Sequence, residues 1–273
     1  MTKVIVIIAD THTGGYTGVC SKNGIALDTG AVITPSKFQQ FLIDSWEDFF
    51  YTFVPSVTTG IKSKILVHNG DAIDGVHHES AEVVPSVQSQ EQAFVEMMKP
   101  IREQYDTYIQ MRGTEVHGGI AEQSTERVAE LLGSLKEKST GRYSHLEKWI
   151  DCEGVILQLS HHIETTRSVA YETSAPMREL VTVWIENSQW GMKMPDIIVR
   201  SHRHRYTCVT LPTRGQDIAC IVTPSWQLKT HYTYKIDRLR MPHIGGIVII
   251  CEDKKWTLEK KLYPLPFPKI ETV

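Results

Sequence analysis

The sequence of 273 residues lacks any hydrophobic run long enough to cross a membrane. Its longest apolar runs, at residues 4–9 and 247–251, have the length of strands and fall far short of the roughly 20 residues of a transmembrane helix. The amino-terminal strand pattern also lacks the small-residue cleavage site of a signal peptide. We therefore expect a cytoplasmic protein that has no membrane partner.

Positive charge is not in excess, and the cysteines follow no binding pattern. The 29 Lys and Arg residues stand against 32 Asp and Glu residues, for a net charge of -3. This balance argues against a surface that attracts nucleic acid or anionic lipid over its whole extent. The five cysteines are an odd number without a CxxC spacing, which argues against a disulfide framework and against a thiolate zinc site.

Strand and helix patterns alternate over the first two thirds of the chain. Apolar runs predict strands at residues 4–9, 64–67 and 108–111, and apolar residues at helical spacing predict helices at 38–53, 88–104, 123–135 and 176–187. After residue 195 the patterns predict a β-meander with strands at 196–200, 206–211, 217–223, 231–236, 247–251 and 256–262, and a hairpin turn at 252–255. This order favours an α/β fold, a four-layer αββα sandwich of two mixed β-sheets flanked by helices.

Histidine is in unusual supply, because most of the 12 histidines stand in short clusters beside carboxylates or other histidines. Five predicted strands end in residue types that bind metals. These residues are Asp10 and His12, then Asp71, then Glu115 and His117, then His161 and His162, and finally His202 and His204. Because ligands gather at the carboxyl ends of strands in α/β sheets, we expect these side chains to converge on one site.

The residue types in these clusters indicate a dinuclear metal centre. Residues two apart on an extended segment project the same way, so Asp10 with His12, and His202 with His204, can hold neighbouring metal positions. Carboxylate oxygen and imidazole nitrogen suit Mn²⁺, Fe, Zn²⁺ or Ni²⁺, of which we expect Mn²⁺ first. Asp71 is the candidate to bridge two ions about 3.5–4 Å apart, which would lower the pKa of a shared water from about 15.7 towards about 7. The hydroxide formed there would hydrolyse a phosphate ester.

The order of these motifs resembles that of the calcineurin-like metallophosphoesterase superfamily. The matching segments are Asp10-x-His12, Gly70-Asp71-x-x-Asp74, Gly113 to His117, His161 and Ser201-His202-x-His204. The resemblance spans roughly residues 1 to 205. It implies one metal on Asp10, His12 and His204, a second on His161 and His202, and Asp71 as the bridge. It also implies a single metallophosphoesterase domain over residues 1–273.

The third motif departs from the family pattern, since Gly113-Thr114-Glu115-Val116-His117 lacks the Asn that usually binds the second metal. Two assignments remain open. Glu115 supplies the missing oxygen ligand and His117 protonates the leaving alkoxide, or Thr114 takes the Asn position and a water completes the metal shell. We favour the first because a carboxylate is a better ligand than a hydroxyl. Asp71 and His117 are then the expected catalytic residues.

The sequence leaves the substrate open. A phosphomonoester or phosphodiester in a nucleotide, a nucleic acid or a phosphoprotein fits the predicted site equally well, and the oligomeric state is open too. A nuclease acting on DNA and a metal-binding scaffold without turnover are the alternatives, the scaffold because of Thr114. A metallo-β-lactamase-like hydrolase fits less well, because its His-x-His leads into Asp-His, whereas Arg205 and Tyr206 follow here.

Several other residues have two interpretations each. His77 and His78 line a phosphate pocket or lie in a solvated loop. Arg200 pairs with an acid or reaches a substrate phosphate, and Trp226 belongs to the core or stacks on a base. For Arg200 and Trp226 the structural interpretation is favoured, as it is for His68 at the end of a strand.

Overall fold

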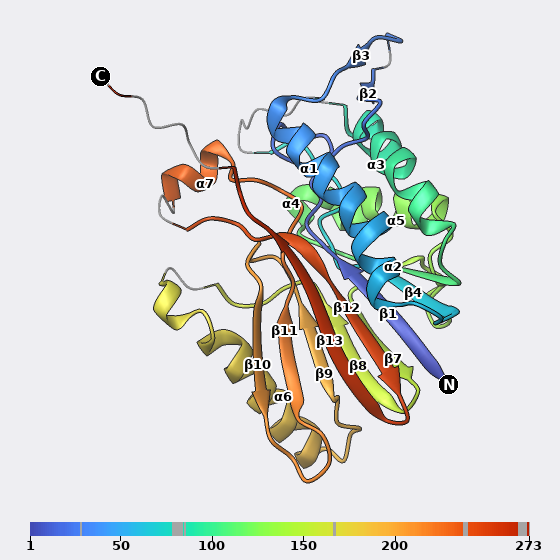
Figure 1. Cartoon of the computed structure of the whole chain (residues 1–273), viewed down its shortest axis with the longest axis vertical. Helices are drawn as coiled ribbons and strands as arrows, with labels where there is room; N and C mark the ends of the chain where they lie inside the picture. The colour runs from blue at the N-terminus through green and yellow to red at the C-terminus, as the bar shows by residue number, and fades with distance from the viewer. Residues whose placement is uncertain are drawn as a thin grey trace.

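Two mixed β-sheets face each other in the computed structural model of the chain, which describes residues 1–27, 29–77, 84, 86–165, 168–236, 240–266 and 272 (Figure 1). The first sheet has the order β13-β12-β1-β4-β5-β6 and consists of β1 (Thr2–Ile8), β4 (Ser63–His68), β5 (Thr107–Met111), β6 (Ser144–His145), β12 (Ile244–Glu252) and β13 (Lys255–Tyr263). The second has the order β10-β11-β9-β8-β7 and consists of β7 (Glu147–Cys152), β8 (Val155–Ser160), β9 (Ile197–Arg200), β10 (Thr207–Leu211) and β11 (Ile218–Val222). A short hairpin, β2 (Ile25–Ala26) with β3 (Val32–Ile33), stands apart from both.

Helices cover the outer face of each sheet. The first sheet carries α1 (Lys37–Asp48), α3 (Val87–Arg102) and α5 (Gln123–Leu131), and the second carries α6 (Ser174–Gln189) (Figure 1). Shorter helices follow α1 as a π-helical turn (Phe49–Phe53) and α2 (Val54–Val57), and elsewhere form α4 (Glu115–Gly118), two 3₁₀ turns (Ile120–Glu122 and Val169–Tyr171) and α7 (His231–Ile236). The predicted four-layer αββα sandwich is confirmed.

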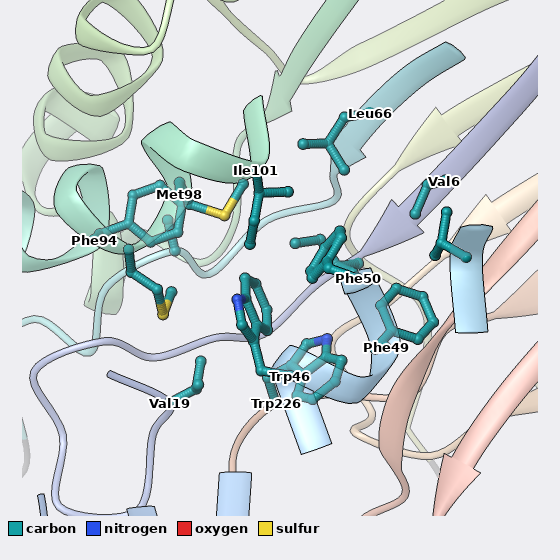
Figure 2. Packing of buried hydrophobic residues seen from close by; sticks show 14 of the residues in the cluster. Val6, Val19, Trp46, Phe49, Phe50, Leu66, Phe94, Met98, Ile101 and Trp226 are labelled. Carbon is teal, nitrogen blue, oxygen red and sulfur yellow. The ribbon is translucent and has the colours of Figure 1, made fainter. Parts of the chain in front are cut away.

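Strand β1 shows why the sheets pack as they do. Its side chains alternate, so that Ile5 and Ile7 enter the core between the two sheets, whereas Val6 enters the core under the helices. Burial on both faces explains the continuous apolar run at residues 4–9. In the helix-covered core, Trp46 packs edge-on against Trp226, which is fully buried (Figure 2). The structural interpretation of Trp226 is confirmed.

The start of helix α1 holds the loop that follows β1. The Ser36 hydroxyl accepts a hydrogen bond from the Gln39 backbone N–H at 3.2 Å, and the Gln39 side chain accepts one from the Ser36 N–H at 3.1 Å. This capping box satisfies two amide groups at the helix start. The Gln39 amide also donates to the carbonyl oxygens of Gly15 and Gly18, at 3.4 Å each, and so connects α1 to the loop that follows β1.

The prediction of a strand at residues 231–236 was wrong, because these residues form helix α7. The alternation of polar and aromatic side chains there resembles a strand pattern, but Thr230 starts a helix. Its hydroxyl accepts a hydrogen bond from the Thr233 N–H at 3.1 Å, and its carbonyl accepts one from the Tyr234 N–H at 3.0 Å. The local cap outweighs the period-two pattern.

The predicted C-terminal meander was also wrong in its connectivity, since its strands divide between the two sheets. Strand β12 pairs antiparallel with β1 in the first sheet, and β13 pairs with β12, whereas β9, β10 and β11 belong to the second sheet. The predicted hairpin turn between β12 and β13 is confirmed, with Asp253 and Lys254 at φ of 48° and 63°. Among the described helices, none combines the length and apolar character that a bilayer crossing requires.

His68 is a structural residue, as the sequence indicated. It ends β4 inside the helix-covered core, where its Nε2 lies 3.0 Å from the Thr11 hydroxyl and its Nδ1 lies 3.1 Å from the Gln110 amide nitrogen. Its ring packs edge-on against Phe94 at 5.1 Å. Burial lowers the pKa of His68 to about 3, so the folded protein holds this imidazole neutral.

We predict that His68 makes the fold sensitive to mild acid. Because the folded-state pKa lies below the unfolded value of about 6.5, the stabilising contribution is complete above that pH and is lost as the pH falls towards 3. Lowering the pH from 7.5 to 5.5 should reduce the free energy of unfolding by about 1.4 kcal/mol through His68 alone. Urea titrations at both pH values should show a loss that is smaller by about this amount in His68→Gln, whose side chain does not titrate, than in the wild type. An equal loss in both proteins would contradict the prediction.

Candidate metal centre

The loops that follow five strands meet at one end of the sandwich, and backbone hydrogen bonds join them. The Asp10 N–H donates to the Gly70 carbonyl at 2.9 Å, and the His12 N–H donates to the Asp71 carbonyl at 3.1 Å. Between the loops of the second sheet, the Ser201 N–H donates to the His161 carbonyl at 2.8 Å. The loops therefore hold one another in register before any side chain is considered.

Two main groups of possible metal ligands lie at this end of the fold, and His12, Asp74 and His117 form a third beside them. Asp10, His12 and His204 form the first, and Asp71, His161 and His202 form the second, with the ligand atoms of each group within 4.8 Å of one another. In the first group, His204 Nε2 lies 3.3 Å from Asp10 Oδ1 and 3.2 Å from His12 Nε2. These are the same two groups that the motif order implied.

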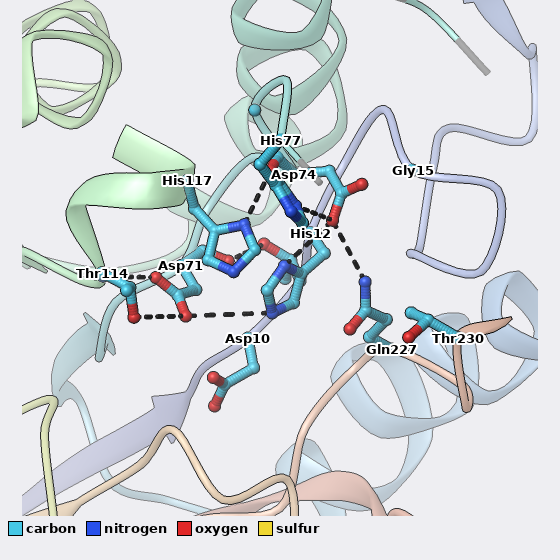
Figure 3. A network of polar contacts seen from close by, with 12 residues as sticks. Asp10, His12, Gly15, Asp71, Asp74, His77, Thr114, His117, Gln227 and Thr230 are labelled. Carbon is cyan, nitrogen blue, oxygen red and sulfur yellow. Dashed lines mark hydrogen bonds and ion pairs between the residues drawn. The ribbon is translucent and has the colours of Figure 1, made fainter. Parts of the chain in front are cut away.

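Asp71 lies between the two groups. Its Oδ2 is 3.1 Å from His161 Nε2 and 3.9 Å from His12 Nε2, so one carboxylate oxygen faces both groups. Its Oδ1 accepts the backbone N–H of Thr114 at 2.6 Å, which fixes the plane of the carboxylate. Figure 3 shows the Asp71 carboxylate joined to Thr114 on one side and directed at His12 on the other.

Five of the six residues in the two main groups have a left-handed backbone. Asp10, His12, Asp71, His202 and His204 have φ between 44° and 68°. This conformation costs an L-residue with a Cβ roughly 1–2 kcal/mol, and such residues concentrate at functional sites. The tight turns aim the side chains inward, which an extended continuation of each strand would not do.

Two glycines permit the close approach of the loops. A Cβ on Gly70, whose φ is +98°, would lie 2.3 Å from His161 Nδ1. A Cβ on Gly113 would lie 2.1 Å from Asp71 Oδ1. Both distances are far inside van der Waals contact, so a larger residue at either position would displace a candidate ligand.

Polar contacts of the second ring nitrogen orient two of the imidazole rings. His161 donates its Nδ1–H to the Asn69 carbonyl at 2.7 Å, and His12 Nδ1 lies 3.2 Å from the Asp74 Oδ1 carboxylate oxygen as an ion pair. Each contact leaves Nε2 directed at its ligand group. Metal-binding histidines in proteins are held in this way, with the second ring nitrogen bonded to a carbonyl or a carboxylate.

Buried carboxylates and imidazoles in this centre shift the pKa values of one another. Burial raises the pKa of Asp71, but the His161 imidazole outweighs burial and holds that pKa well below its usual range. Burial lowers the pKa of His161, yet the Asp71 carboxylate raises it to about 9 overall. Burial and the neighbouring His161 charge lower the pKa of His202 to about 4.

The donor set fits divalent cations. Both oxygens of Asp10 are buried, and neither makes a hydrogen bond with the described residues. An ionised carboxylate without donors is costly in the interior. In addition, His12 Nε2 and His204 Nε2 face each other at 3.2 Å, where two lone pairs repel unless a proton or cation lies between them. Carboxylate and imidazole without thiolate suit Mn²⁺, Fe, Zn²⁺ or Ni²⁺.

The structure does not bring Glu115 to either group, contrary to our preferred assignment. Helix α4 begins at Glu115, and this side chain is exposed. Thr114 lies there instead, with Oγ1 3.3 Å from Asp71 Oδ2 and 3.3 Å from His202 Nδ1. Because the helix begins directly after Thr114, the Glu115 carboxylate points to solvent and the Thr114 hydroxyl lies beside Asp71. The geometry therefore favours the Thr114 alternative.

His117 lies at the edge of the centre and belongs to neither of the two main groups. Its Nδ1–H donates to the Asp74 carbonyl at 2.6 Å, and its ring packs edge-on between His12 at 4.4 Å and His77 at 4.5 Å. Burial, followed by the nearby His12, lowers the pKa of His117. Its side chain lines a cleft of about 600 Å³ that also contains Asp71 and His202, so it can reach a group bound in that cleft.

The structure also distinguishes the remaining residues that had two interpretations. His161 is buried in the centre whereas His162 is exposed, and Arg200 forms an ion pair with Glu179, as favoured above. His77 lines the cleft, 3.9 Å from Asp74 Oδ1, and His78 lies outside the described residues.

The sequence interpretation gave no role to two residues that support the centre. Asp74 belongs to a quoted motif, and its carboxylate fixes His12. Gln227 donates to Asp74 Oδ1 at 3.2 Å, and no sequence signal indicated this contact. Gln227 comes from the segment after β11, so only the fold brings it beside Asp74.

No family model matches this sequence, and no curated protein matches it. Solved structures similar to this chain include vacuolar protein sorting 29 from Cryptosporidium parvum, at 11% identity over 96% of this chain and 98% of that one, with a TM-score of 0.39. A metallophosphoesterase from Sphaerobacter thermophilus is similar at 11% identity over 96% and 89%, with a TM-score of 0.37. The sulfate thiohydrolase SoxB from Thermus thermophilus is similar at 11% identity over 96% and 56%, with a TM-score of 0.41.

One of these structures thus belongs to the class that the sequence motifs resemble. Likeness at this level concerns the fold only. The functional argument therefore rests on the side chains of the centre.

We predict that metal content separates Glu115 from the residues of the two groups. Purified protein loaded with Mn²⁺ should hold about two ions per chain. His204→Ala and His161→Ala should each lose about one ion, because each removes an imidazole from a different group. Glu115→Ala should keep the full content. Elemental analysis after dialysis measures this, and a loss of metal in Glu115→Ala would restore that residue as a ligand.

Proposed function

We propose that this chain is a metal-dependent phosphoesterase that hydrolyses a phosphomonoester or phosphodiester at a dinuclear centre. The observation that carries the proposal is the position of Asp71, whose Oδ2 faces His161 of one group at 3.1 Å and His12 of the other at 3.9 Å. A carboxylate shared by two Asp/His groups is the arrangement of a two-metal hydrolase. The cleft beside it gives a substrate access to both groups.

The residues divide the work of hydrolysis. When bound, two divalent cations supply Lewis acidity, which activates water and neutralises charge on the phosphoryl oxygens. Asp10, His12 and His204 would hold one cation, His161 and His202 the other, and Asp71 both. Thr114 completes the wall of the second group by contacting Asp71 and His202.

In this proposal His117 moves the proton that the reaction requires. As the water oxygen bonds to phosphorus, the P–O ester bond breaks and the leaving alkoxide takes a proton. The His117 ring is held through Nδ1 by the Asp74 carbonyl, so Nε2 is the atom that can carry this proton. Negative charge on a bound phosphate opposes the pKa-lowering effects of burial and of His12 on His117.

The proposal extends to the metal and the setting. Mn²⁺ is the metal that we propose first. We propose that residues 1–273 act as one domain, in part because β1 and β12, from opposite ends of the chain, pair in one sheet. All five cysteines are free thiols, four of them buried, which fits a reducing compartment such as the cytoplasm.

Substitution of the bridging carboxylate should abolish turnover. We expect the Mn²⁺-loaded wild type to hydrolyse p-nitrophenyl phosphate or bis(p-nitrophenyl) phosphate, and Asp71→Asn and His161→Ala to lose at least about 10³-fold in kcat/KM, since each disrupts the metal pair. Glu115→Ala is the control and should retain wild-type activity, because its side chain is exposed and lies outside the ligand groups. A wild type that binds metal but turns over neither ester would identify a metal-binding scaffold instead.

The role of His117 should depend on the leaving group. An alkoxide needs a proton whereas p-nitrophenolate leaves without one, so His117→Gln should lower kcat by about 10²–10⁴-fold on an alkyl phosphate ester and by about tenfold or less on the p-nitrophenyl ester. Glucose 6-phosphate and p-nitrophenyl phosphate are suitable substrates for a phosphomonoesterase, and methyl p-nitrophenyl and dimethyl phosphate for a phosphodiesterase. An equal loss on both members of the pair would mean that His117 binds the phosphate and does not protonate the product.

A further inference from the structure

A second pocket adjoins the metal centre on the other side of the 202–205 loop. Its volume is about 180 Å³, and it shares His202, His204, Gln227 and Thr233 with the larger cleft. The two spaces are therefore neighbours along this shared lining.

This second pocket is lined by positive charge. Arg203, Arg205, Lys229 and Arg240 all contribute to its wall, and the described lining residues include no acid. We call this space the basic pocket. Its character contrasts with the chain as a whole, whose net charge is -3, so the positive charge is concentrated locally.

Glu172 is an acid that contacts the basic residues of this pocket. It forms an ion pair with Arg205 and lies 4.0 Å from Arg240 Nη1. Arg203 donates through Nη1 to the backbone carbonyl of Glu172 at 2.8 Å, and its buried Nη2 has no hydrogen-bond partner among the described residues. Burial lowers the pKa of Arg203, the Glu172 carboxylate opposes that effect, and the charges of Arg240 and Arg205 add to it.

We infer that the basic pocket binds a second phosphate group of the substrate, next to the phosphate that is hydrolysed at the metals. The inference rests on the proposed phosphoesterase function and adds a substrate class to it. Arg203, Arg205 and Arg240 line the pocket with planar guanidinium groups. The shape of a guanidinium group suits two parallel hydrogen bonds to the oxygens of one phosphate. The substrate is then a molecule with neighbouring phosphates, either successive phosphates of an oligonucleotide or the phosphates of a nucleoside diphosphate.

Direct binding tests the basic pocket without catalysis. In titration calorimetry of the Mn²⁺-loaded protein, pyrophosphate should bind at least about tenfold more tightly than inorganic phosphate. In Arg240→Gln this advantage should fall to about threefold or less. Arg178→Gln is the matched control, because Arg178 is exposed on α6 and pairs with Glu164 at the surface. The same comparison after EDTA treatment should still show weaker pyrophosphate binding to Arg240→Gln than to the wild type.

Hydrolysis of matched substrates then identifies the source of the second phosphate. If the substrate is an oligonucleotide, kcat/KM for pTpT or TpTp should exceed that for TpT by at least about tenfold, and Arg240→Gln should remove most of this difference. If it is a nucleoside diphosphate, hydrolysis of the 5′ ester bond of ADP, which releases adenosine and pyrophosphate, should exceed hydrolysis of AMP to adenosine and phosphate in the same way. Metal content of each variant, measured in parallel, excludes an indirect effect on the centre.

The outcomes separate the two claims. Equal ratios of pyrophosphate to phosphate affinity in the wild type and in Arg240→Gln would overturn the basic pocket as a phosphate site, even where ester hydrolysis upholds the phosphoesterase. Conversely, the absence of hydrolysis of every ester would overturn the proposed function, and the pyrophosphate titrations would still decide whether the pocket binds a second phosphate.

Discussion

The buried, ionised carboxylate of Asp71 is the feature on which this end of the molecule depends. It is almost inaccessible to water, it is surrounded by imidazoles, and its backbone has a φ of 53° that its residue type adopts at a cost. Such a group is tolerated only where its surroundings offset the loss of hydration. The Thr114 N–H and the His161 ring do so in part, and the orphaned oxygens of Asp10 beside them indicate that cations complete the balance.

The two sheets of the sandwich bring the charged side chains of this centre together at one edge. Both sheets point the carboxyl ends of their parallel strands to the same edge, where one sheet supplies Asp10, His12 and Asp71 and the other supplies His161, His202 and His204. Each of these two groups takes residues from both sheets, whereas the third, His12 with Asp74 and His117, follows strands of the first sheet alone. The larger cleft and the basic pocket meet at the 202–205 loop, so the loop that carries two candidate ligands also carries two of the arginines.

Sequence patterns predicted the long elements well and the short ones poorly. The apolar run of β1 and the stripes of α1, α3 and α6 reflect burial against large cores, and such periodicity survives in any tertiary context. At residues 231–236 a single threonine cap decided between helix and strand, although the period-two pattern favoured a strand. Glu115 was chosen over Thr114 on ligand chemistry, but the start of α4 turns the carboxylate to solvent and leaves the hydroxyl beside His202.

The order of strand and helix patterns was enough to indicate the fold class, and the Asp, Glu and His residues after predicted strands indicated, apart from Glu115, the residues that the structure brings together. This is because strand ends in an α/β sheet share one edge whatever the detailed geometry. Only the tertiary structure decided that Asp71 faces both groups, that Gln227 supports Asp74, and that Arg203 and Arg240 share a pocket. These contacts join segments far apart in the chain through left-handed turns and crossings between sheets, which leave no periodic trace in the sequence.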